Sequence, residues 1–72
     1  MIHFNETIRR IDVWFDHQFK TWYVTEYNEA GDQVGMSTDH YHKRDAVRYA
    51  RGRQAALAGA QRLRIFTRAG GI

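Results

Sequence analysis

The sequence contains no cysteine, no proline and no long apolar run. Without cysteine the chain forms no disulfide and offers no thiolate to a metal. The absence of disulfides is typical of proteins in a reducing compartment. The first ten residues, MIHFNETIRR, include no apolar stretch of the length that a signal peptide or a membrane span requires. We therefore expect a cytoplasmic protein with no membrane partner.

The length of 72 residues predicts one domain with a small core. A chain of this size buries only about 60% of the surface that its unfolded form exposes, so its stability is marginal unless something adds to the core. Self-association is one such addition, and we expect a homodimer. Residues 11–72 are assigned to the domain. Residues 1–10, which begin with a polar stretch, are assigned to an N-terminal arm or edge strand.

Charge is distributed unevenly along the chain. Residues 1–42 carry three lysines and arginines against seven acids, whereas residues 43–72 carry eight against one. Arginine outnumbers lysine nine to two, and a guanidinium group is better suited than an ammonium group to bind phosphate and to stack on rings. A basic half favours an anionic partner such as DNA or RNA. A GC-rich genome explains the arginine ratio equally well.

Alternation of apolar and polar residues predicts four strands, at residues 8–15, 21–27, 33–38 and 62–68. The polar loop NEAGD, which contains glycine, separates the second strand from the third and is typical of a hairpin. The apolar residues that alternate with polar ones are expected to face the core: Ile11, Val13, Phe15, Trp22, Val24, Val34, Met36, Leu63 and Ile65.

Residues 42–59 are predicted to form the one helix. Asp39 or His42 is expected to cap its start, and Gly59 to end it. Gly52, inside the segment, costs about 1 kcal/mol relative to alanine. The residues that share the core-facing side at helical spacing are Ala46, Val47, Ala50, Gln54, Leu57 and Ala58. A row of arginines lies along one flank: Arg44, Arg48 and Arg51.

The element order is therefore β-β-β-α-β. It predicts a single small α+β domain with a four-stranded, mainly antiparallel sheet and one helix packed on one face. Two hairpins leave the third strand pointing like the first, so that a right-handed crossover places the fourth strand parallel to the first. The other sheet face stays open. By alternation it carries aromatic and arginine side chains: Trp14, Tyr23, Tyr27, Arg64, Phe66 and Arg68.

Four short motifs carry a resemblance. They read Trp22-Tyr23-Val24, His42-Lys43-Arg44-Asp45-Ala46, Leu63-Arg64-Ile65 and Gly70-Gly71-Ile72. They resemble the W-x-V strand, T-K-x-x-A helix entry, apolar strand and D-G-x-I ending of a family of small prokaryotic domains of unknown function. Histidine replaces the usual hydroxyl residue at position 42, and the acid before the last glycine is absent. The resemblance covers roughly residues 11–72 and implies this fold and a bacterial or phage origin, but no activity.

Two hypotheses about function follow. An open sheet face with rings among arginines resembles the platforms on which unstacked bases lie, and the helix row offers a second basic surface. We therefore expect a nucleic-acid-binding accessory protein, although no RNP-type motif is present. The alternative is a protein-interaction module, because aromatic residues and arginine are equally common at protein interfaces. Such a module is either a homodimer through the open face or a phage-type adaptor or inhibitor of a host protein.

No residue set predicts catalysis. His40 and His42 come with neither cysteine nor the H-E-x-x-H spacing of a metal-binding helix. Ser37 lacks the glycine elbow of a nucleophile. Acids such as Asp12 and Asp16 are expected to balance neighbouring arginines rather than to act as acid and base. We expect no enzymatic activity, no cofactor and no metal.

Overall fold

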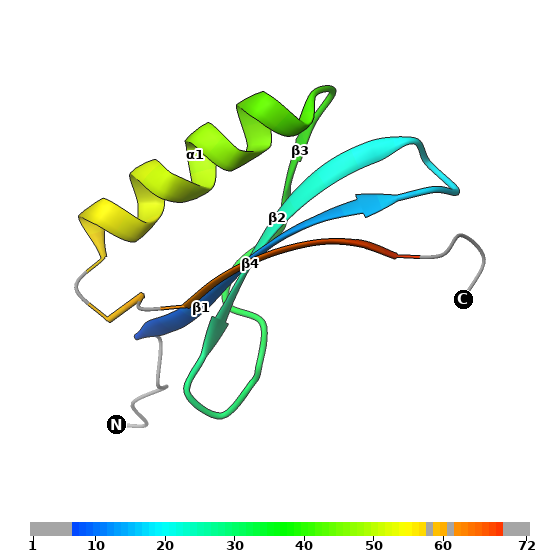
Figure 1. Ribbon diagram of the computed structural model, residues 1–72. Coiled ribbons are helices and arrows are strands. Elements are labelled where there is room, and N and C mark those ends of the chain that lie inside the picture. The colour runs from blue at the N-terminus through cyan, green and yellow to red at the C-terminus, as the bar shows by residue number, and fades with distance from the viewer. Residues whose placement is uncertain (1–6, 58, 61, 69–72) are drawn as a thin grey trace.

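Four strands and one helix make up the part of the chain that the computed structural model describes, residues 7–57, 59–60 and 62–68 (Figure 1). The elements are β1 (Ile8–Asp16), β2 (Thr21–Asn28), β3 (Thr38–His40), α1 (Lys43–Ala56) and β4 (Arg62–Arg68). The predicted element order and α+β class are confirmed. Of the predicted N-terminal arm, residues 1–6 lie outside the described residues, and residues 8–10 form the start of β1.

The sheet is mixed, and its strand order is β3-β2-β1-β4. β1 pairs antiparallel with β2 and parallel with β4, so that Val13 lies between Val24 and Ile65. β2 pairs antiparallel with β3. The parallel pairing of the first and fourth strands, predicted from the crossover, is therefore confirmed. α1 lies across one face of this sheet (Figure 1).

The core lies between α1 and the sheet. Its buried residues come from the strands, the helix and the α1–β4 connection: Ile8, Ile11, Val13, Val24, Ala46, Ala50 and Ala60. Ala46 and Ala50 are fully buried, and their small side chains let α1 approach the sheet closely. Ile65 lies on the helix side of β4, as predicted, but remains 42% exposed.

The third strand is the element that the alternation pattern predicted least well. β3 covers only residues 38–40, and before it Gln33 forms an isolated bridge with Tyr27. Val34 packs against the core as predicted, whereas Met36 is 92% exposed and does not face inward. Gly35 between them has a φ of 71°, in the left-handed region, which ends the strand alternation at that point.

α1 falls within the predicted segment but is shorter. His42 occupies the N-cap position, although its side chain makes no capping hydrogen bond, and Asp45 in the first turn complements the positive end of the helix dipole. The helix ends at Ala56, so the predicted stop at Gly59 is wrong. Gly59 instead lies in the connection to β4. α1, the helix of the described residues, is too short and too polar to cross a membrane.

Candidate functional site

The strand register places the aromatic and arginine residues together on the sheet face that α1 leaves open. Across β2, β1 and β4 the neighbours on this face form three rows, which are Tyr23, Trp14 and Phe66; Thr25, Asp12 and Arg64; and Tyr27, Arg10 and Arg62. These nine residues are called the open face below. Five of the six predicted residues of this face belong to the rows. The sixth, Arg68, lies opposite Asp16 in the register, and its side chain is outside the described part.

Asp12 lies at the centre of the open face and is only 2% exposed. Arg64 donates two hydrogen bonds to it, from Nε to Oδ1 at 2.9 Å and from Nη2 to Oδ2 at 2.8 Å. The Nε of Arg10 lies 3.2 Å from Oδ1 of the same carboxylate. Asp12 thus balances neighbouring arginines, as expected, and the hydrogen bond to Asp12 raises the pKa of Arg64 above its ordinary value.

Each of the two arginines held by Asp12 also lies against an aromatic ring. The guanidinium carbon of Arg10 is 4.2 Å from the ring centroid of Tyr27, and that of Arg64 is 5.1 Å from the centroid of Phe66. These are cation–π distances. The carboxylate and the rings together fix two cations in the plane of the open face.

Trp14 and Tyr23 form a ring pair in the next row. Their centroids are 5.0 Å apart and the planes are tilted by 32°. The indole Nε1 of Trp14 donates to the Thr25 hydroxyl at 3.0 Å, and that hydroxyl lies 2.6 Å from the hydroxyl of Ser37. Both rings are half-buried. The ring pair therefore offers an aromatic surface whose orientation is set before any ligand arrives.

The helix row is a separate basic surface. Arg44, Arg48 and Arg51 are exposed, and Arg44 has a 3.5 Å contact with Asp45. Among the described residues, Arg48 and Arg51 take part in no ion pair. Because α1 covers the sheet face opposite to the open face, the two predicted surfaces do not merge (Figure 1).

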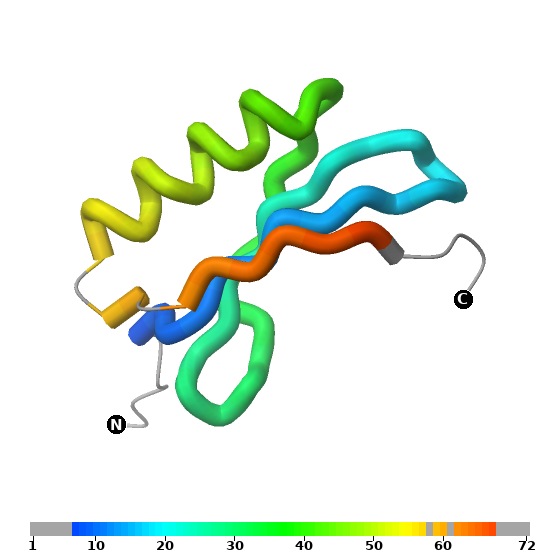
Figure 2. Tube along the Cα trace, viewed as in Figure 1, coloured from blue at the N-terminus to red at the C-terminus, as the bar shows by residue number. Residues whose placement is uncertain are grey.

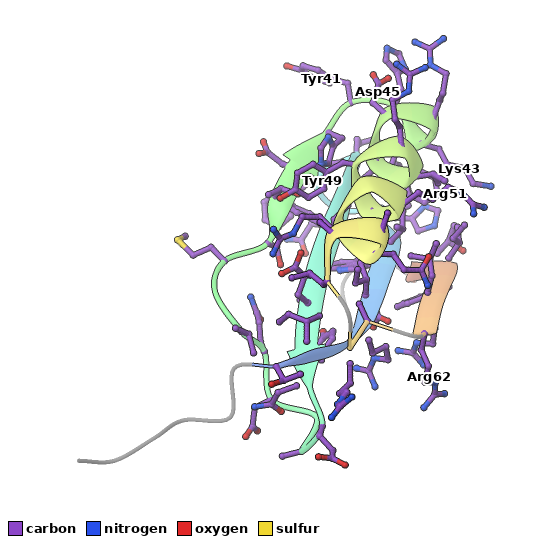
Figure 3. All side chains as sticks on the ribbon, turned by 90° about the vertical axis from the view of Figure 1, so that its left-hand side faces the viewer. Tyr41, Lys43, Asp45, Tyr49, Arg51 and Arg62 are labelled. Carbon is purple, nitrogen blue, oxygen red and sulfur yellow. The ribbon has the colours of Figure 1, made fainter. Side chains whose placement is uncertain are left out.

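The two flanks of α1 differ. Figure 3 shows Lys43 and Arg51 on one flank and Tyr41 and Tyr49 on the other. On the tyrosine side, the ring of Tyr49 lies 5.3 Å from that of His40 in β3.

Arg53 has a structural role. Its Nε and Nη2 donate to the carboxylate of Glu26 in β2 at 2.6 and 2.8 Å, and this hydrogen bonding raises the pKa of Arg53. The ion pair ties α1 to the sheet.

Sequence reasoning placed Arg62 on the outward face but missed Arg9 and Arg10, which gather with it where β1 and β4 begin. A register shift between Ile8 and Arg10 places Arg9 in a bulge, outside the regular pairing. The available signal was the spacing of Ile8 and Ile11, both buried. Residues three apart in a regular strand point to opposite faces, so burying both on one face requires such an irregularity.

No protein-family model, curated protein or solved structure matches the chain. The resemblance to a prokaryotic domain family therefore stays a prediction that depends on the four motifs. Within the described residues, no group of three or more histidine, aspartate or glutamate side chains is arranged to hold a metal ion.

Proposed function

We propose that the protein is a nucleic-acid-binding accessory protein, of the bacterial or phage origin that its motifs suggest, and that it binds single strands on the open face. The observation that carries the proposal is the placement of Arg10 and Arg64, each held by the buried Asp12 and each lying against a ring. Proteins that bind unstacked strands with little sequence preference combine positive charge along the backbone path with aromatic rings on which bases stack, and arginine adds cation–π contacts.

The open face divides the work between two regions. Trp14 and Tyr23 supply the ring surface on which a base stacks, which contributes about 1–3 kcal/mol per base in proteins of this kind. Arg10 and Arg62, neighbours in the register, supply positive charge to the sugar-phosphate backbone. Arg64 contributes less to phosphate binding because its guanidinium fork is occupied by Asp12.

The two tryptophans of the chain provide a built-in test, because they lie on opposite faces of the sheet. Trp22→Phe leaves Trp14 on the open face as the only tryptophan. Addition of oligothymidylate at low salt is expected to quench its emission, since a stacked base contacts the indole. The matched Trp14→Phe variant keeps only Trp22, which packs on the core side, and its emission is expected to stay constant.

Two results would count against the proposal. A gel shift at low salt in which the parent protein retains neither DNA nor RNA removes nucleic-acid binding altogether. Binding that changes the emission of Trp22 and not that of Trp14 removes the open face as the binding surface.

The alternative function, a protein-interaction module, uses the same face. The observation that favours it is the half-buried Trp14–Tyr23 ring pair, whose remaining exposed surface a second copy or a host protein would cover. A homodimer through this face is expected to become a monomer in the Trp14→Glu variant. Sedimentation velocity decides the point, and a parent protein that already sediments as an 8.5 kDa monomer opposes the homodimer.

A further inference from the structure

A pocket of about 440 Å³ opens at the end of the open face where β1 and β4 begin. Three segments distant in the sequence form it: the start of β1, the end of β2 with its turn, and the connection from α1 to β4. Figure 2 shows the start of β1 beside that connection. Arg9, Arg10 and Arg62 line the pocket, and Glu29 is the acid among its described lining residues.

The backbone brings these arginines together. The bulge in β1 leaves Arg9 outside the regular pairing, next to Arg10, and the parallel register places Arg62 beside Arg10. Gly59 lets the α1–β4 connection pass close to them. A Cβ at that position would lie 3.3 Å from Nη1 of Arg9 and 3.0 Å from the carbonyl oxygen of Ile8.

The positive charge of the three arginines that line the pocket exceeds the negative charge of Glu29. Arg64 takes both oxygens of Asp12, so Arg10 has only the 3.2 Å contact with that carboxylate, and its buried Nε makes no hydrogen bond. Arg9 and Arg62 take part in no ion pair with another described residue. Neighbouring like charges on adjacent strands are unfavourable, and an anion with several acceptor oxygens would relieve them.

We propose that this pocket binds a phosphate group, whose oxygens match the planar forks of the three guanidinium groups. The phosphate belongs either to the backbone of a bound strand or to a free phosphorylated ligand. The first source rests on the proposed function. Trp14 is four positions beyond Arg10 along β1, about 13 Å at the usual rise per residue, which is a distance that a short single strand spans.

The test is a titration of the ¹⁵N-labelled protein followed by NMR, at constant ionic strength. The probes are inorganic pyrophosphate in one arm and oligothymidylate without terminal phosphates in the other. Gly31 and Gly59 line the pocket, and their amide signals are expected to shift with at least one probe. Sodium chloride at the same ionic strength serves as the control for bulk salt.

A matched pair of variants separates contact from net charge. Arg62→Gln removes an exposed arginine of the pocket, and Arg48→Gln removes an exposed arginine of the helix row. In Arg62→Gln, the affinity measured from the Gly31 and Gly59 signals is expected to fall by at least about tenfold, because a charged hydrogen-bond donor is lost. The second is expected to change it less than about twofold. Retained dispersion of the other amide signals shows that each variant is folded.

The outcomes distinguish the two proposals. Pyrophosphate shifts at the pocket without oligonucleotide binding support the phosphate site and overturn the proposed function. If oligothymidylate shifts the pocket signals and Arg62→Gln selectively weakens that response, both the phosphate site and the proposed function are supported. In a third outcome, oligothymidylate quenches Trp14 while Arg62→Gln and Arg48→Gln lose the same amount of affinity for it. That result overturns the phosphate site and leaves the proposed function in place. No shift at Gly31 or Gly59 with either probe also overturns the phosphate site.

Discussion

Asp12 is the residue on which the geometry of the open face depends most. Its carboxylate is buried, accepts two hydrogen bonds from Arg64 and contacts Arg10. The hydrogen bonds to Asp12 raise the already high pKa of Arg64 in the folded state. The contribution of this contact to folding stability is therefore fully present below the pKa that Arg64 has in the unfolded chain. It is lost only as the pH rises through the folded pKa, in strongly alkaline solution. The contact between Asp12 and Arg64 is therefore expected to stay intact when the pH rises from neutral to mildly alkaline.

Asp12→Asn is expected to lower the free energy of unfolding by about 2 kcal/mol, because charge-assisted hydrogen bonds are lost and two cations remain unbalanced. Urea denaturation followed by circular dichroism measures the change. Asp45→Asn is the control. It removes the same charge from a side chain that is 43% exposed and whose contact with Arg44 is 3.5 Å long, and it is expected to cost less than about 1 kcal/mol. Equal costs would contradict the anchoring role of Asp12.

At the scale of elements, regular alternation and helical spacing predicted β1, β2, β4 and α1 because each keeps one face on the core over several residues. β3 is different, because Gly35 takes a left-handed conformation that alternation cannot reveal. The placement of Trp14, Tyr23 and Phe66 on one face followed from the same alternation, whereas the register that puts them side by side did not. The Arg9, Arg10 and Arg62 pocket did not, since it requires a bulge, a parallel register and the close passage of Gly59.

The two glycines near the end of α1 are expected to respond oppositely to alanine. Gly52 is exposed inside the helix, and a Cβ there meets nothing within 4 Å, so Gly52→Ala is expected to raise the free energy of unfolding by about 1 kcal/mol. At Gly59 a Cβ would lie 2.9 Å from Cγ2 of Thr7 and 3.0 Å from a β1 carbonyl oxygen.

Gly59→Ala is therefore expected to lower the free energy of unfolding by at least about 1 kcal/mol, because β1 and the connection must move apart. Thermal and urea denaturation of the two variants give the comparison. A Gly59→Ala protein as stable as the parent would show that the connection does not approach β1 this closely.

At the scale of the whole molecule, the basic charge of the second half of the sequence is divided between two surfaces. The helix row lies on one side of the sheet, whereas Arg62 and Arg64 lie on the other, where Arg10 of the first half joins them. The imbalance along the sequence therefore does not become one basic side in space. Asp12 comes from the acidic half and lies among arginines, which is why composition alone overstates the charge of the open face.

The logarithm of the affinity for oligothymidylate is expected to fall linearly with the logarithm of the salt concentration. Contacts from three arginines, Arg9, Arg10 and Arg62, correspond to a slope of about −2 for a single strand. Fluorescence titration of the Trp22→Phe protein at four or more salt concentrations measures it. A slope near zero would show that phosphate contacts do not drive binding.

The most direct measurement of the central claim compares that slope in two double variants of equal net charge. Arg9→Gln with Arg62→Gln changes the open-face end of the sheet, and Arg48→Gln with Arg51→Gln changes the helix row. All four arginines are exposed and outside the ion pairs of the described residues. We expect the first variant to have a slope weaker by about 1.4 and the second to keep the parent slope. Equal changes, or a larger change in the helix variant, would contradict phosphate binding by Arg9 and Arg62 at the open-face end of the sheet.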